Sequence, residues 1–180
     1  AGTTRMCYRH DVVQVFSQIV TESIAKANAE GDPLVLTFGH IEVTPNTVNV
    51  VPGDAMFTMD CRHTDKDTLV RFSEEIEADM ARIAAEHGAD IEIDRWMDED
   101  PVPMNPELVA KIEQVAKDSG ANYRMMHSGA GHDSQVIAPH VPTGMLFVPS
   151  VKGISHNPAE YTEAEDLKAG IDMLGAALYN

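Results

Sequence analysis

The order of apolar patterns in residues 10–94 restricts the fold of this chain more than any other feature. Apolar residues recur at three- and four-residue spacing over 10–30 and again over 65–87, which predicts two amphipathic helices. Three segments of extended or alternating apolar character are predicted strands: 34–43, 55–62 and 90–94. Helix, strand, strand, helix, strand is the order of a ferredoxin-like βαββαβ unit without its first strand. We therefore expect an α+β domain whose sheet has an unpaired edge that recruits other strands.

A second domain is predicted after this unit. The acidic, proline-bounded segment 96–103 has the composition of an interdomain hinge. Asn105 then fits the N-cap of a helix, and a capping box at 162–165 opens the last helix. We expect one domain over residues 1–97 and another over 98–180, the second being a single α/β layer.

Two histidines of the second domain lie in Gly/Ser-rich loops that flank an apolar run. The run 144–148 is bounded by prolines and predicts a strand buried on both faces, as in parallel sheets, and 123–126 predicts a shorter strand. His132 and His156 would then lie at the ends of a core strand, where α/β sheets bind ligands. Neutral imidazole suits zinc, but a catalytic zinc usually takes three protein ligands. Spacing alone leaves both a surface role and a ligand role open.

Charge and cysteine content exclude several kinds of partner. The chain has 13 Lys and Arg against 29 Asp and Glu, a net charge of −16, whereas nucleic acids and anionic membranes need clustered basic residues. No apolar stretch reaches the ~18 residues that a membrane span requires. Cys7 and Cys61 are too few for a disulfide framework. We expect a reduced, cytoplasmic protein that binds neither nucleic acid nor membrane.

Several short motifs are similar to those of a known enzyme family. They read A-G-T-T-R-M (1–6), N-V-V-P-G (49–53), D-C-R-H (60–63), M-H-S-G-A-G-H-D-S (126–134) and G-I-S-H-N-P-A-E (153–160). Together they resemble the metal-dependent amidase/carbamoylase branch of the M20 peptidase-like family, with Arg5 in place of the usual proline. The resemblance implies a lid/dimerisation domain, incomplete at its first strand, followed by the C-terminal α/β part of a zinc-peptidase-like catalytic domain.

The resemblance also implies roles for individual residues. His156 matches the family's C-terminal metal ligand. The other ligands and the acid/base glutamate would precede the first residue, so the family's two divalent ions, zinc or manganese, are not expected to bind tightly to this chain alone. Asn49 and Arg62 match substrate-binding positions, with Arg62 reaching from a partner subunit. Gly131 and His132 match loop positions that contact substrate, and a histidine there can donate to a developing oxyanion.

The implied reaction is hydrolysis of a ureido or carbamoyl C–N bond in a small acid by a homodimer, with release of ammonia and carbon dioxide. The substrate would be a ureido acid, an N-carbamoyl-L-amino acid or N-carbamoyl-beta-alanine. A second alternative is a non-catalytic dimerisation fragment, in which Asn49 structures a turn and Arg62 and His132 have surface or loop roles. A serine hydrolase is not favoured, because the G-x-S-x-G order of a nucleophile elbow is absent.

Overall fold

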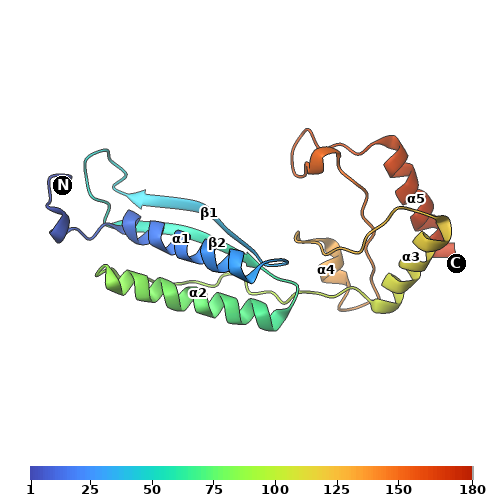
Figure 1. Ribbon diagram of the computed structural model, residues 1–180, viewed down its shortest axis with the longest axis horizontal. Helices are drawn as coiled ribbons and strands as arrows, with labels where there is room; N and C mark the ends of the chain where they lie inside the picture. The colour runs from blue at the N-terminus through green and yellow to red at the C-terminus, as the bar shows by residue number, and fades with distance from the viewer. Residues whose placement is uncertain (180) are drawn as a thin grey trace. The chain divides into compact units, whose positions relative to one another are not determined.

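The computed structural model describes residues 1–179 (Figure 1). The chain divides into an N-terminal unit, Ala1–Pro101, and a C-terminal unit that begins at Val102. The N-terminal unit contains η1 (Met6–Tyr8), α1 (Val12–Glu30), β1 (Val35–Thr44), β2 (Asp54–Arg62) and α2 (Lys66–Glu86). The C-terminal unit contains α3 (Pro106–Ser119), α4 (Asp133–Ile137), η2 (Val151–Gly153) and α5 (Ala164–Tyr179). The expected mixture of helices and strands is confirmed.

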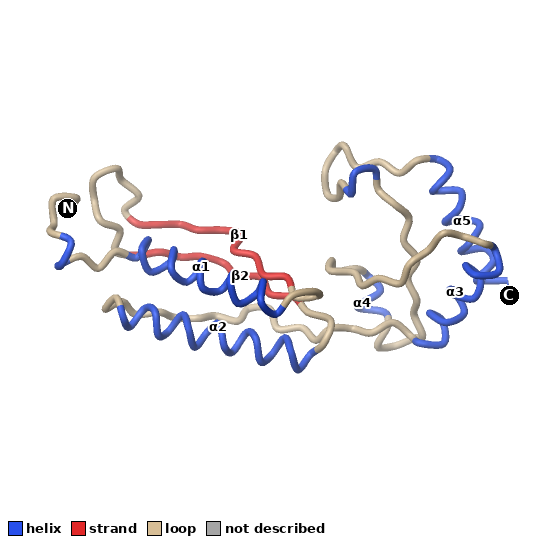
Figure 2. The backbone as a smooth tube through the Cα atoms, in the orientation of Figure 1, coloured by secondary structure: helices blue, strands red, loops and turns tan. Residues whose placement is uncertain are grey.

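The strands β1 and β2 form an antiparallel pair that runs the full length of both (Figure 2). Val35 pairs with Arg62 at one end, and Thr44 pairs with Asp54 at the other. The register shifts by one residue at Gly39, a bulge on β1. Because side chains alternate along a strand, one face of this pair is available to the helices and the other faces away.

Both long helices pack on the same face of the strand pair. The buried core comprises Val15, Ile19, Leu34, Phe72, Ile76, Met80, Ile83 and Ala84, and the half-buried strand residues Leu36, Phe38, Phe57, Met59 and Cys61 pack against it. The carboxylates of Asp11 and Asp65 accept from backbone N–H groups at the starts of α1 and α2. The two predicted helices and the first two predicted strands are therefore confirmed.

The predicted strand over 90–94 is wrong: within the described residues, this segment forms no ladder. Ala89 and Ile91 still pack against the core, so the alternation that suggested a strand reflects real burial. After α2 the segment returns and lies opposite the start of β2, separated from it by a cavity, in the arrangement of a split βαβ unit. A strand takes its hydrogen bonds from a neighbouring strand. In a split βαβ unit, the neighbour of this segment would be a further strand lying between residues 90–94 and β2.

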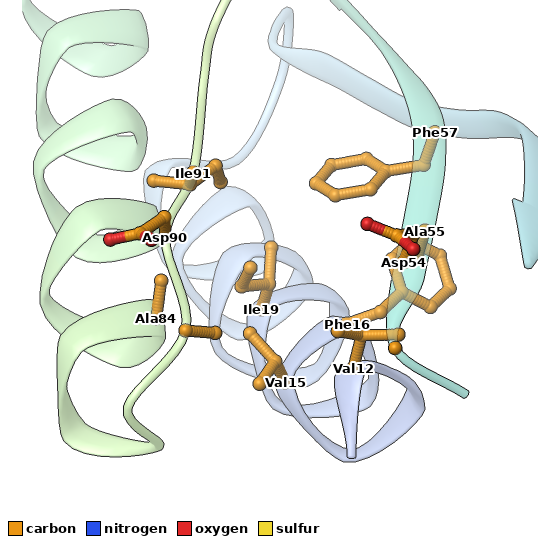
Figure 3. Close-up of a pocket in the computed structure, with 12 residues that line it drawn as sticks. Val12, Val15, Phe16, Ile19, Asp54, Ala55, Phe57, Ala84, Asp90 and Ile91 are labelled. Carbon is orange, nitrogen blue, oxygen red and sulfur yellow. The ribbon is translucent and has the colours of Figure 1, made fainter. Parts of the chain in front are cut away.

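A cavity lies where that further strand would be. It has a volume of about 140 Å³, and its walls are Asp54, Ala55 and Phe57 of β2 on one side and Ala89, Asp90 and Ile91 on the other. Figure 3 shows Phe57 and Ile91 facing each other above the α1 side chains Val15 and Ile19. The groove is therefore largely apolar at its base and is bounded by two extended segments.

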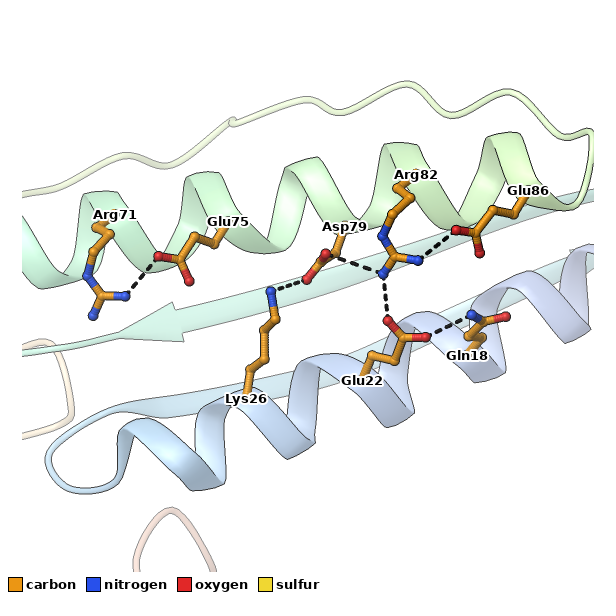
Figure 4. Close-up of polar contacts among 8 residues, drawn as sticks. All are labelled: Gln18, Glu22, Lys26, Arg71, Glu75, Asp79, Arg82 and Glu86. Carbon is orange, nitrogen blue, oxygen red and sulfur yellow. Dashed lines mark hydrogen bonds and ion pairs between the residues drawn. The ribbon is translucent and has the colours of Figure 1, made fainter.

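An ion-pair network joins α1 to α2 on their outer side (Figure 4). Arg82 contacts Glu22, Asp79 and Glu86, and the Lys26 ammonium contacts Asp79. Lys26 holds the pKa of the Asp79 carboxyl below its usual range. The pairing therefore stabilises the fold above the unfolded pKa of about 3.9, and this contribution is lost as the pH falls through the lower folded pKa.

Removing the Lys26 charge is expected to destabilise the N-terminal unit. The substitution Lys26→Met keeps the aliphatic stem but leaves the Asp79 carboxylate, which is only 18% exposed, without that cation. We expect a loss of about 1–2 kcal/mol in the free energy of unfolding, measured by urea denaturation. The matched control is Lys66→Met, whose pair with Asp100 is 58% and 62% exposed; it should cost no more than about 0.5 kcal/mol. Equal losses in the two variants would contradict the interpretation.

In the C-terminal unit, α3 begins and ends as predicted. The Asn105 side chain accepts from the N–H groups of Glu107 and Leu108. Gly120 ends the helix in the left-handed conformation, with φ +68°. The helix α5 packs on α3, and the Ser119 hydroxyl donates to the Met173 sulfur.

The two strands predicted in the C-terminal unit are wrong, because neither segment is a strand in the described chain. Residues 144–148 run between α3 and α5: a Cβ on Gly144 would meet Ile112 at 3.1 Å, and one on Gly170 would collide with Val148. Gly144 to Leu146 are half-buried, whereas Phe147 remains 43% exposed. The apolar run therefore has helices to pack on, but no hydrogen-bonding neighbour in the described residues. Residues 123–126 are exposed and likewise form no ladder in the described chain, and α4 was not predicted.

No helix among the described residues is both long and apolar enough to cross a membrane.

Candidate functional site

The loop before α4 holds His132 between a hydroxyl and an aromatic ring. The Ser128 Oγ lies 2.7 Å from the His132 Nε2 atom, and it also accepts from the Ala130 N–H at 3.2 Å. The His132 ring is tilted against Phe147, with 5.7 Å between ring centroids. His132 occupies the N-cap position of α4 without a side-chain capping bond, so its imidazole is not used to start the helix.

Sequence reasoning missed the contact between Ser128 and His132. The glycines at 129 and 131 let the chain fold back so that Ser128 and His132, four residues apart, can meet. These glycines are the only feature of the sequence that pointed to this contact. Within the described residues, no carboxylate hydrogen-bonds to His132, so the geometry of a Ser-His-Asp triad is absent. Ser128 instead orients the imidazole.

A second closed loop carries His156. The Val151 N–H donates to the Tyr161 carbonyl at 2.8 Å, which joins the two ends of the loop. His156 has φ +53°, an unusual conformation for a side chain of this size, and its N–H donates to the Glu160 carboxylate at 2.8 Å. This internal bond helps to hold a conformation that costs energy, and the loop leaves the His156 side chain exposed.

These residues do not by themselves fit a metal ion. Among residues 1–179, no group of three His, Cys, Asp or Glu side chains comes together to hold one. The structure also shows no hydrogen bond or ring contact between His132 and His156 within the described chain. His156 is thus a single candidate donor, and the chemistry of a metal site would need ligands from elsewhere.

On the N-terminal unit, Arg62 lies at the end of β2 and is paired with Asp60. The Arg62 Nε donates to Asp60 Oδ1 at 2.9 Å, and Nη2 donates to Oδ2 at 2.6 Å. Both side chains are on the sheet face away from the helices, because Met59 and Cys61 pack on the core. The guanidinium lowers the pKa of the Asp60 carboxyl, whereas burial, followed by the Asp60 charge, raises the pKa of the Cys61 thiol to about 11.

Asn49 lies in the loop that joins β1 to β2. Its backbone carbonyl accepts from the Gly2 N–H at 2.7 Å, and a Cβ on Gly2 would lie 2.8 Å from that oxygen. Arg9 holds the same N-terminal turn by donating to the carbonyls of Gly2 and Thr4. The first residues of the chain are therefore fixed beside the Asn49 loop.

The two predicted substrate-binding residues of this unit are not brought together. Asn49 precedes the first residue of β2, and Arg62 is its last residue. A strand of this length separates its ends by roughly 25 Å, at about 3.3 Å per residue. Within one N-terminal unit, Asn49 and Arg62 therefore lie toward opposite ends of β2. Gly131, the remaining predicted binder, lies in the His132 loop.

Comparison with known proteins gives a consistent result over the whole chain. The sequence model of peptidase family M20/M25/M40 matches residues 2–180. The chain is 56% identical to an allantoate amidohydrolase of Escherichia coli (strain K12) over 179 residues, which is 99% of the chain and 44% of that protein. It is 40% identical to an allantoate amidohydrolase of Bacillus subtilis (strain 168), over 99% of the chain and 43% of that protein.

A solved structure agrees with the sequence matches. The chain resembles the crystal structure of an amidase of the hydantoinase/carbamoylase family from Burkholderia multivorans with a TM-score of 0.94 and 35% identity, over 99% of the chain and 43% of that protein. The chain thus spans less than half the length of the curated relatives that it matches.

Proposed function

Since the chain belongs to peptidase family M20/M25/M40, we propose that it is part of an amidohydrolase that cleaves the ureido C–N bond of allantoate and releases ammonia and carbon dioxide. The observation that carries this proposal is the 56% identity to an allantoate amidohydrolase, which extends over 99% of the chain. The likeness to a hydantoinase/carbamoylase-family amidase supports an alternative substrate, an N-carbamoyl-L-amino acid or N-carbamoyl-beta-alanine.

The candidate residues take roles that suit their surroundings. The exposed guanidinium of Arg62 is suited to the carboxylate of the substrate. His132, oriented by Ser128, is suited to polarise the ureido carbonyl, and the absence of a side chain at Gly131 lets substrate approach the backbone. His156 would contribute one ligand to the two divalent ions, zinc or manganese, with the other ligands supplied from outside this chain.

The separation of Asn49 and Arg62 along β2 favours a homodimer. If both residues contact the same substrate molecule, two copies of the N-terminal unit must supply them. We therefore propose that this unit is a lid and dimerisation domain, with Arg62 serving the site of the partner, and that the C-terminal unit is part of the catalytic domain.

We also propose that the groove between β2 and residues 89–91 is filled by a strand from outside residues 1–179. In a split βαβ unit this strand runs antiparallel to both neighbours, so its last residue lies near the start of β2. Ala1 and Gly2 are held at that same end, beside the Asn49 loop. A segment that directly precedes Ala1 would reach the groove without a long connection.

The proposed location is the cytoplasm, and the proposed ligand is a small acid. Cys7 and Cys61 are both free thiols, as is usual in a reducing compartment. The net charge of −16 disfavours nucleic acid and anionic membrane surfaces.

The decisive assay compares substrates on the longer protein that contains this chain. The protein is loaded with manganese or zinc and given allantoate, an N-carbamoyl-L-amino acid or N-carbamoyl-beta-alanine, and ammonia release is measured. We expect the highest kcat/KM for allantoate, and no turnover by residues 1–180 alone. Preference for an N-carbamoyl acid would support the alternative substrate, and turnover by the 180-residue chain would contradict the assignment of metal ligands outside it.

A further inference from the structure

We infer that Asp60 is a positioning residue that holds the Arg62 guanidinium in the orientation that receives the carboxylate of the substrate. The inference deepens the proposed function and rests on it, because it assumes that Arg62 binds the acid group. It assigns a role to a carboxylate that would otherwise be expected to compete with the substrate.

The contact is a two-point grip between neighbouring positions of one strand. Residues two apart on a strand point to the same side, so Asp60 and Arg62 are side by side on the outer face of β2. The carboxylate accepts from Nε at 2.9 Å and from Nη2 at 2.6 Å. Two parallel bonds between two planar groups fix the plane of the guanidinium, whereas a single bond would let it turn.

The backbone under this pair is well anchored. Asp60 and Arg62 pair with Thr37 and Val35 of β1, and Cys61 between them packs against the core on the opposite face. The carboxylate is therefore held by a paired strand, and its position does not depend on a loop. The contact of Asp60 with Arg62 is made through Nε and Nη2 on one edge of the guanidinium.

The pair is also open to a ligand. The side chains of Asp60 and Arg62 are each 50% exposed. An unrestrained arginine in that setting would sample many rotamers, and ordering it would cost part of the binding energy. With Asp60 in place this ordering precedes binding, which is why we expect Asp60 to raise affinity for the acid in spite of its own negative charge.

The test is Asp60→Asn in the metal-loaded, longer protein, assayed with the substrate that it turns over best. The asparagine keeps the size of the side chain but gives up the charge-assisted two-point grip. We expect KM to rise about 5- to 10-fold, with kcat changed less than about 2-fold, because the ordering of Arg62 affects binding more than the chemical step. Glu42→Gln, which removes another carboxylate from the sheet without contact to Arg62, should leave both constants unchanged.

A double-mutant cycle separates this inference from the proposed function. Arg62→Lys alone should raise KM, and adding Asp60→Asn to it should have little further effect, because both act through one guanidinium. An unchanged KM in Arg62→Lys would refute the role of Arg62 itself. If KM rises in Arg62→Lys but is unchanged or lower in Asp60→Asn, the role of Arg62 stands and only the inference about Asp60 is overturned. A lower KM in Asp60→Asn would show that Asp60 competes with the substrate for Arg62.

Discussion

Fusing one β-strand to the start of the chain is expected to raise the thermal midpoint of the N-terminal unit by about 10 °C, which corresponds to roughly 2 kcal/mol for a unit of this size. The strand should be about nine residues long, to match β2, with apolar residues at every second position. It would cover the side chains of Phe57 and Ile91 and give the outer backbone groups of β2 a hydrogen-bonding partner. The same strand should also form hydrogen bonds with residues 90–94, so that this segment becomes a strand.

The measurement is calorimetry of the chain with and without the added strand, together with amide hydrogen exchange of β2. The matched control has the same length and composition, but its apolar positions are shifted by one residue, so that charged side chains would face α1. Because a one-residue shift moves every apolar side chain to the other face, this control should not raise the midpoint. Equal gains from both fusions would show that the groove does not select a strand.

Replacing His156 is expected to have the largest effect on activity. In the longer protein, His156→Asn should lower kcat/KM at least about 100-fold, or roughly 3 kcal/mol of transition-state stabilisation, with loss of bound divalent metal. Asparagine is chosen because it tolerates the positive φ of this position better than most residues, so the loop that Glu160 holds should survive.

The control for this variant is His140→Ala, a histidine outside the two candidate loops, which should retain activity within about 2-fold. Metal content is measured by elemental analysis, and thermal midpoints show whether both variants are folded. Retained activity and metal in His156→Asn would remove His156 from the site. Loss of activity with metal retained would instead place it among the groups that contact substrate.

The periodic pattern of apolar and polar residues could not predict the geometry of the two loops in the candidate site. The alternation along β2 placed Arg62 on the same face as Asp60, and the structure shows the two-point contact between them. The approach of Ser128 to His132 and the φ of +53° at His156 arise from loop closures, which no periodic pattern encodes. The distance between Asn49 and Arg62 depends on the full length of a paired strand, which single residues do not reveal.

The sequence by itself determined the helices α1, α2 and α3, because a helix bonds within its own segment and its caps, such as Asp65 and Asn105, are adjacent in the chain. It also determined the family, through motifs spread over its whole length. Only the tertiary structure decided which extended segments become strands. Residues 90–94 and 144–148 have the side-chain pattern of strands, but a strand takes its hydrogen bonds from a neighbour, and the described chain supplies one only to β1 and β2.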